Sequence, residues 1–353
     1  MSKISDRKAL VVGASGLAGG NLLAHLLETK SWDIVTLSRR APANCDGFSH
    51  LPVDLLDWEQ CRQAAPSLAD VTHVFFCARS TKENYVIDLD PNRLIVENLL
   101  DALLPVASRL KHVQILHGMK WYGSNLGPYR TPAKESHPRL AGRNFYYEQL
   151  DAIIARHQGM PWSWSTLRPH FICGVWVGSP SNPLSILGAY AAIMKELGRS
   201  FDFPGEQAAF DAALNFTDVR LLAKAMEWAA VEPRCANEAF NIVNGDTFRW
   251  SGVWGMLADH FGMKVGSVQP MKLRDFMADK QATWAAIVAR NGLKAEPFGD
   301  IADWAFADVL FEGAWEQTAS VVKAHQYGFT GMVDTEEMLI DILSQYRALK
   351  LLP

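Results

Sequence analysis

The feature that most constrains the fold is a glycine-rich turn near the N-terminus, between a short apolar segment and an apolar-periodic one. Residues 9–12 (ALVV) run into Gly13, Gly16 and Gly19, and leucines then recur at helical spacing as far as Leu27. A short, fully apolar run predicts a parallel-sheet strand covered on both faces. The glycines allow a tight turn, and the helix start offers free N–H groups to a pyrophosphate. In this strand–turn–helix context, the G-x-x-G-x-x-G pattern predicts dinucleotide binding.

Strands and helices alternate along the next 200 or so residues, roughly the length of one large domain. The expected strands are residues 33–38, 51–55, 71–77, 111–116, 161–168 and a returning strand at 238–241. Helices are expected after the glycine turn, from Asp90 as N-cap with Pro91 in the first turn, after Gly142, over 183–198 and over 216–230. This alternation predicts an α/β fold with a doubly wound parallel Rossmann sheet.

The periodicity changes after residue 168, which predicts a second, smaller and mainly helical unit. Residues 1–168 and about 213–243 are expected to form the dinucleotide-binding domain, and 169–212 with about 244–353 a substrate-binding domain. Near the C-terminus, one group of apolar side chains is interpreted as core and pocket wall rather than as an interface: Trp304, Phe306, Leu310, Phe311 and Trp315.

The composition argues against several classes of partner. The chain has 353 residues and a formal net charge of −4, without a basic stripe, so nucleic acid and anionic membranes are poor partners. No apolar run reaches the roughly 18 residues of a membrane span, and the polar start is unlike a signal peptide. The histidines form no zinc motif and the cysteines no CxxC pair, so we expect no metal site and a cytoplasmic protein with reduced thiols. The cysteines are Cys45, Cys61, Cys77, Cys173 and Cys235.

The end of the second expected strand indicates which nicotinamide cofactor binds. An acidic residue there would bond the ribose 2′-hydroxyl of NAD, whereas arginine can pair with the 2′-phosphate of NADP. The sequence Ser38-Arg39-Arg40 therefore predicts NADPH, with two solvated surface arginines as the alternative. The residues expected to bind the cofactor are Gly13, Ser15, Gly16, Leu17, Ser38, Arg39, Arg40, Asp54, Leu55, Ala78, Lys120, Tyr146, Pro169 and Ile172.

The segment after the fifth expected strand carries the candidate catalytic groups. Most Rossmann short-chain reductases place a tyrosine and a lysine four residues apart on one helix. Here Leu150 stands four residues after Tyr146, and Asp151 four residues after Tyr147, so that spacing is absent. A cationic partner must come from elsewhere, and Lys120, on the loop closing the fifth strand, can reach the mouth of the sheet. Core tyrosines and a solvated loop lysine are the alternatives.

Together, these residues resemble the progesterone 5β-reductase/iridoid synthase-like enzymes, which are atypical extended short-chain dehydrogenases/reductases. The resemblance spans nearly the whole chain and rests on residues 13–19, 39–40, 110–112 (LKH), 118–122 (GMKWY), 144–147 (NFYY), 164–165, 168–169, 203–205 (FPG), 237–241 (NEAFN), 244–246 (NGD), 250, 254, 283–284 and 327–329 (YGF). It implies NADPH-dependent 1,4-reduction of an α,β-unsaturated carbonyl compound, an enone or enal. It also implies that Tyr146 and Lys120 are catalytic.

The sequence departs from the family pattern at several positions. Trp121 stands where a histidine usually follows the lysine, and Leu150 where an acidic residue is common. The loop between Lys120 and Tyr146 is shorter, and residues 175–179 form a small insertion near the expected pocket. Because such loops shape the pocket, the physiological substrate is left open.

In the expected mechanism, hydride adds to the β-carbon while a phenol hydrogen bond from Tyr146 stabilises the developing enolate. Lys120 adds positive potential, and Tyr147 is kept as the alternative catalytic tyrosine. Two other functions stay open: 1,2-reduction of a ketone or aldehyde on the same fold, and an NADP-binding redox sensor without turnover. The stereochemistry and the source of the proton are not determined. Extended reductases often form dimers, so a homodimer is possible here, although no segment of the sequence demonstrates one.

Overall fold

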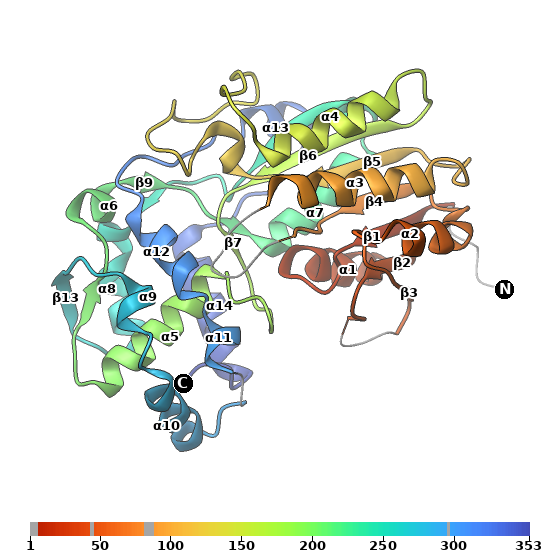
Figure 1. The fold of residues 1–353 in the computed structure, drawn as a ribbon. Helices are drawn as coiled ribbons and strands as arrows, with labels where there is room; N and C mark the ends of the chain where they lie inside the picture. Colours follow the sequence, from red (N-terminus) through yellow and green to blue (C-terminus); the bar gives the residue numbers. More distant parts are fainter. Residues whose placement is uncertain (1–5, 43–45, 81–87, 295–296) are drawn as a thin grey trace.

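A computed structural model describes residues 6–42, 46–80, 88–294 and 297–353, in a sheet unit beside a mainly helical unit (Figure 1). The centre of the sheet unit is a seven-stranded parallel sheet in the order β11-β6-β5-β4-β1-β2-β3. Its strands are β1 (Lys8–Val12), β2 (Asp33–Ser38), β3 (Ser49–Pro52), β4 (His73–Phe76), β5 (His112–Leu116), β6 (Ser163–Pro169) and β11 (Glu238–Ile242). The strand order reverses between β1 and β4, where open α/β sheets bind ligands beyond the carboxyl ends of the strands. The doubly wound Rossmann sheet expected from the sequence is confirmed.

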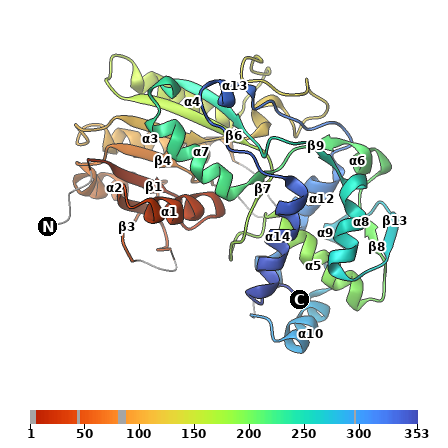
Figure 2. The ribbon, with the colours of Figure 1, turned by 180° about the vertical axis from the view of Figure 1, so that it is seen from behind.

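Helices cover both faces of the sheet, which explains why its strands are apolar on both sides (Figures 1 and 2). Leu10 and Val12 of β1 pack in one core with α3 (Leu89–Leu103), whereas Ala9 and Val11 pack in another with α1 (Leu17–Thr29) and α7 (Val219–Val231). Helix α4 (Phe145–His157) lies against α3, as does the short α2 (Trp58–Ala64). The 3₁₀ turns η1 (Ala65–Leu68) and η4 (Pro233–Cys235) complete this unit.

The second unit is built around α5 (Pro183–Glu196), whose residues from Pro183 to Met194 are all buried. Around it lie α6 (Gln207–Asp211), α8 (Trp250–Phe261), α9 (Leu273–Phe276), α10 (Gln281–Asn291), α11 (Phe298–Ile301), α12 (Trp304–Glu312) and α14 (Thr335–Ala348). Six short strands form three two-stranded sheets. These pair β7 (Ile172–Cys173) with β10 (Thr217–Asp218), β9 (Ala213–Leu214) with β12 (Phe248–Arg249), and β8 (Phe201–Phe203) with β13 (Val265–Val268). Helix α13 (Val322–Gln326) returns to β11. The expected domain borders stay predictions.

The third strand lies earlier than expected, at Ser49–Pro52 rather than 51–55. Asp54 and Leu55 therefore follow the strand. The Asp54 carboxylate accepts a hydrogen bond from the Leu56 N–H over 3.0 Å, a local turn that competes with strand pairing.

The start of α3 also differs from the expectation. The helix begins at Leu89, with Asp88 rather than Asp90 at the N-cap position. The Asp90 carboxylate instead pairs with the guanidinium of Arg143, 2.6 Å away. Two acidic residues near one helix start made the N-cap ambiguous in the sequence.

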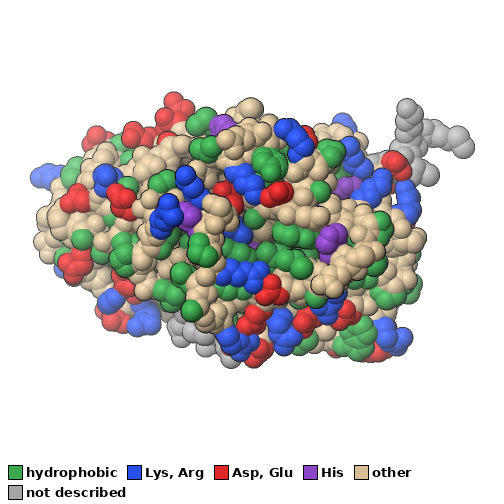
Figure 3. Space-filling view, turned by 90° about the horizontal axis from the view of Figure 1, so that it is seen from above, with side chains coloured by type: hydrophobic (Ala, Val, Ile, Leu, Met, Phe, Trp, Pro, Cys, Tyr) green, Lys and Arg blue, Asp and Glu red, His purple; other side chains and the backbone are tan. Residues whose placement is uncertain are grey.

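The remaining bulk features concern thiols, charge and membrane contact. Cys61, Cys77, Cys173 and Cys235 are free thiols, and Cys45 lies outside the described residues. On the face in Figure 3, basic and acidic side chains are interspersed rather than gathered by sign. None of the helices in the described ranges is long and apolar enough to cross a membrane. The same ranges hold no group of three His, Cys, Asp or Glu side chains suited to a metal ion.

Candidate active site

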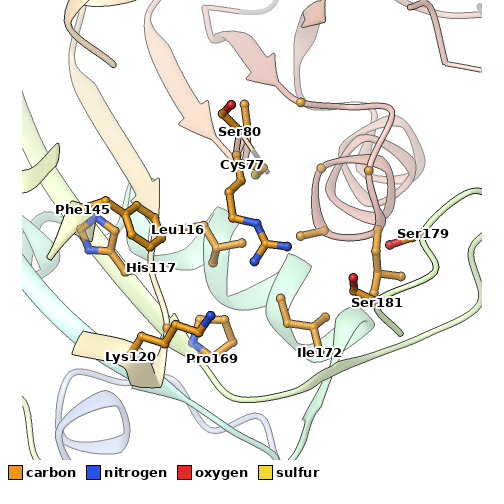
Figure 4. A pocket seen from close by; sticks show the side chains of 18 of the residues that line it. Cys77, Ser80, Leu116, His117, Lys120, Phe145, Pro169, Ile172, Ser179 and Ser181 are labelled. Carbon is orange, nitrogen blue, oxygen red and sulfur yellow. The ribbon is translucent and has the colours of Figure 1, made fainter. Parts of the chain in front are cut away.

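A cavity of about 1150 Å³ lies beyond the carboxyl ends of the sheet strands, where the two units meet. It exceeds the roughly 300–1,000 Å³ of a typical small-molecule site. Each residue that the sequence assigns to cofactor binding lines it, from Gly13 to Ile172, although its binding role stays a prediction. Figure 4 shows Lys120 directed into the cavity, with Ser179 and Ser181 across from it.

The glycine turn forms one end of this cavity. Gly13 has a φ of 84°, and a Cβ there would stand 2.9 Å from the backbone nitrogen of Ala78, two residues after β4. A Cβ on Gly19 would stand 2.3 Å from the carbonyl oxygen of Gly13. Gly16 is the N-cap of α1, and no side chain caps the N–H groups that follow. These glycines hold the turn against the sheet and leave the helix N-terminus open to an anion, which suits a dinucleotide pyrophosphate.

The arginines expected to select NADPH line the same cavity. Arg39 and Arg40 are exposed and follow directly after β2. The Ser38 hydroxyl donates to the Arg40 carbonyl over 2.7 Å, which shapes the turn. Neither guanidinium has a carboxylate of the described residues within 4 Å, so both charges are available to an anionic group.

Two segments far apart in the sequence bring Lys120 and Tyr146 to one cavity. Lys120 lies in the 3₁₀ turn η3 (Met119–Tyr122) after β5, and Tyr146 lies in the first turn of α4. The Asn144 side chain joins them: its amide donates to the Lys120 carbonyl over 2.8 Å, and its oxygen accepts from the Tyr146 N–H over 3.0 Å. The cap that starts α4 therefore also holds the turn that carries Lys120.

The structure separates the two tyrosines that the sequence left as alternatives. Tyr146 lines the cavity and is 8% exposed. Tyr147 does not line it; its hydroxyl donates to the Trp121 carbonyl and accepts from the Leu140 N–H. Tyr147 is thus occupied in holding the loop after η3. Catalysis by Tyr146 stays a prediction.

Two buried histidines to which the sequence gave no role also line the cavity. His117 directly follows β5, shares a 2.7 Å hydrogen bond with Thr166, and lies with its ring centroid 4.8 Å from that of Tyr146. His170 follows β6, and burial lowers its pKa to about 4, so it is neutral at pH 7. Both follow strands that are neighbours in a parallel sheet, and this shared edge is the signal that could have identified them.

The far wall of the cavity comes from the second unit. Phe306 and Trp315 line it, as expected for a pocket wall, whereas Leu310 and Phe311 lie in the core and Trp304 packs against that core. The insertion expected near the pocket contributes Val177, Gly178 and Ser179.

Comparisons with known proteins identify the family of the chain. The model of the PRISE-like Rossmann-fold domain matches residues 54–353. An (S)-8-oxocitronellyl enol synthase of Nepeta racemosa is 32% identical over 98% of this chain and 91% of its own length. A 3-oxo-Delta(4,5)-steroid 5-beta-reductase of Arabidopsis thaliana is 32% identical over 100% of this chain and 95% of its own.

Solved structures that resemble this one share its fold. A putative epimerase of Burkholderia cenocepacia superposes with a TM-score of 0.70 at 20% identity, covering 97% of this chain and 98% of its own. A UDP-glucose 4-epimerase of Thermus thermophilus, solved with NAD, has a TM-score of 0.66 at 17% identity and covers 96% and 99%. Both likenesses extend over the sheet and the helical unit together. The chain therefore belongs to the PRISE-like Rossmann-fold family and has the extended short-chain dehydrogenase/reductase fold.

Proposed function

We propose that this protein is an NADPH-dependent reductase that saturates the C=C bond of an enone or enal by 1,4-addition. Family membership makes it an oxidoreductase acting on C=C bonds, as the names of its relatives indicate. One observation supports NADPH-dependent 1,4-reduction in particular: Tyr146 and Lys120 line the same cavity, and the Asn144 side chain bonds to the backbone of both. A small-molecule substrate, a cytoplasmic location and the absence of nucleic-acid or membrane partners belong to the same proposal.

The residues that line the cavity suit the binding of NADPH. The open N-terminus of α1 suits the pyrophosphate, and Arg39 and Arg40 suit a 2′-phosphate. Pro169, the last residue of β6, and Ile172, in β7, would lie beside the nicotinamide. When bound, NADPH supplies the hydride that adds to the β-carbon of the substrate.

Tyr146 and Lys120 act on the carbonyl end of the substrate. As negative charge develops on the carbonyl oxygen, the Tyr146 hydroxyl donates a hydrogen bond that strengthens in the transition state. The ammonium of Lys120 adds positive potential to the same site and favours proton donation by the phenol. His117 and His170 are held neutral by burial, so neither competes as a cation at neutral pH.

NADPH oxidation, followed by nicotinamide absorbance, tests this proposal against small enones, enals and a bulky steroid enone. A saturated carbonyl product supports 1,4-reduction, whereas an allylic alcohol contradicts it and indicates 1,2-reduction. Binding of NADPH without turnover of any acceptor would favour the redox-sensor alternative. NADH run in parallel tests the cofactor preference separately.

A further inference from the structure

Four buried side chains form a continuous stack that ends on Tyr146. The guanidinium carbon of Arg168 lies 3.8 Å from the ring centroid of Trp121. The Trp121 and His117 ring centroids are 5.4 Å apart with planes 23° from parallel, and those of His117 and Tyr146 are 4.8 Å apart at 38°. All four residues are at most 8% exposed.

We propose that this stack fixes the position of the Tyr146 phenol in the cavity. In it His117 and Trp121 are positioning residues, and Arg168 is the anchor at the far end. The inference rests on the proposed function in taking Tyr146 as the catalytic tyrosine, but the placement of the phenol can be measured without turnover.

Arg168 is suited to anchor the stack because its guanidinium is held on two sides. It donates to the Tyr122 hydroxyl over 2.8 Å, and that hydroxyl donates to the Asn241 side chain over 2.7 Å. Among the described residues, no carboxylate lies within 4 Å of Arg168. The indole face of Trp121 therefore stabilises this buried charge together with the Tyr122 hydroxyl, and a cation–π contact is stronger when it is desolvated.

His117 transmits the placement of Trp121 to Tyr146. Its 2.7 Å hydrogen bond with Thr166 on β6 sets the rotation of the ring, and burial followed by the charges of Arg168 and Arg139 keeps its pKa well below the usual range. Its Nε2 is buried and has no hydrogen-bond partner among the described residues. The fold accepts the free-energy cost of this buried polar atom at the place where the ring fits between Trp121 and Tyr146. A neutral ring in that place acts by packing.

The Tyr146 hydroxyl lies close to the backbone of Gly118, and its ring lies between two aromatic neighbours. A Cβ built on Gly118 would stand 3.1 Å from the phenol oxygen, so no side chain of residue 118 bounds that oxygen. The ring is held between His117 on one side and Phe145, at a centroid distance of 4.1 Å, on the other. A shift of about 1 Å at a reacting group can cost on the order of a hundredfold in rate.

Two substitutions at His117 separate the ring from the hydrogen bond. His117→Phe keeps an aromatic ring and loses the bond to Thr166, whereas His117→Asn keeps a hydrogen-bonding group and loses the ring. We expect kcat within about threefold of wild type for His117→Phe and a loss of about 10–100-fold for His117→Asn. The KM for the enone and the Kd for NADPH should stay within about threefold in both, because the change acts on placement and not on binding.

A double-substitution cycle tests whether the stack acts as one unit. Trp121→Leu alone should lower kcat as His117→Asn does, and the double variant should be about as slow as the slower single one. Losses that multiply would contradict a single unit. Trp162→Phe is the matched control, since Trp162 is fully buried in a different core, and it should leave kcat unchanged.

Fluorotyrosine labelling with ¹⁹F NMR reads the phenol directly, with the Tyr146 resonance assigned through Tyr146→Phe. We expect one narrow resonance in wild type and His117→Phe, and a broadened or divided one in His117→Asn. The inference is overturned if His117→Asn keeps wild-type kcat, if its resonance is unchanged, or if His117→Phe is as slow as His117→Asn. If His117→Asn does not fold, Trp121→Leu replaces it, and its kcat and ¹⁹F resonance decide the inference in the same way. Full turnover by Tyr146→Phe would reject the catalytic assignment alone, and the NMR result would still decide the placement.

Discussion

The phenol oxygen of Tyr146 lies against the α-carbon of Gly118, so closely that a methyl group on Gly118 would stand 3.1 Å from it. The contact joins the strand-end loop after β5 to the first turn of α4. Gly118 has an extended backbone, with φ of 178° and ψ of −173°, which any residue can adopt. Glycine is therefore needed here for space, because a side chain would meet the phenol.

Gly118→Ala should move the phenol and slow catalysis without unfolding the protein. The added methyl group also meets the Pro169 carbonyl oxygen at 3.4 Å, so it cannot turn away from Tyr146. We expect kcat to fall about tenfold, with the melting temperature nearly unchanged, since no backbone strain is added. Steady-state kinetics and thermal melting check this together. An unchanged kcat would mean that the phenol has no role at this place.

The two neighbouring tyrosines should respond in opposite ways to loss of the hydroxyl. Tyr146→Phe should lower kcat by about 10²–10³ while NADPH still binds, because a donor to the developing oxyanion is lost. Tyr147→Phe should cost about 1 kcal/mol of unfolding free energy through its bonds to Trp121 and Leu140, and less than about tenfold in kcat. Turnover and urea unfolding of both variants decide the assignment. The reverse pattern would identify Tyr147 as catalytic.

Removing either of the arginines that follow β2 should weaken the binding of NADPH but not that of NADH. Arg39→Ala and Arg40→Ala should each raise the KM for NADPH about 10–100-fold, the loss of a charge-assisted contact, with little change for NADH. Arg62→Ala is the matched control, because Arg62 is 61% exposed, lies outside the cavity and pairs with Glu59. Equal losses for NADPH and NADH would show that the arginines do not read the 2′-phosphate.

Acid should destabilise the fold partly through His73, a buried residue of β4. Burial, followed by the charges of Arg7 and Lys111, lowers its pKa to about 4. An unfolded histidine titrates near 6.5, so between these values the unfolded chain binds the extra proton and stability falls as the pH falls. His73→Leu should flatten that decline by about 1 kcal/mol per pH unit between roughly pH 6 and pH 4.5.

Urea unfolding at a series of pH values checks this prediction. The Thr72 hydroxyl, which shares a bond with His73, keeps its bond to the Lys8 carbonyl in the variant. The other buried histidines titrate in both proteins; burial sets most of the lowered pKa of His112, and only the smaller part due to the charge of His73 differs in the variant. Parallel curves for wild type and His73→Leu would show that His73 does not contribute to the acid sensitivity.

The sheet could be predicted from the sequence because its signals are local. Strand β2 spans Asp33–Ser38 as expected, and its four inner residues, mostly apolar, are all buried, as in a strand covered on both faces. Strand β3 was misplaced because it is only four residues long and half-exposed, so its pattern carries little information. The short α2 was missed for a similar reason: Cys61 is its only buried residue.

Part of the cavity lining could be predicted from the sequence, but His117 and His170 were missed, and the stack behind Tyr146 could not be predicted. Strand ends of a parallel sheet meet at one edge, so Lys120 and the residues after β6 could be brought together by topology alone. The contact of Trp121 with Arg168 and His117 has no such signal, because it joins η3, β6 and the residue after β5 through side-chain orientation. Choosing Tyr146 over Tyr147 likewise required the position of Leu140, a loop residue with no periodic pattern.

The measurement that tests 1,4-reduction most directly is to locate the transferred hydrogen in the product. An enone accepted in the screen would be reduced with NADPH that carries deuterium at C4 of the nicotinamide, and the product analysed by NMR. We predict deuterium on the β-carbon of a saturated carbonyl compound, formed about 10²–10³ times more slowly when Tyr146→Phe replaces the wild type under the same conditions. Deuterium on the carbonyl carbon of an allylic alcohol would contradict 1,4-reduction.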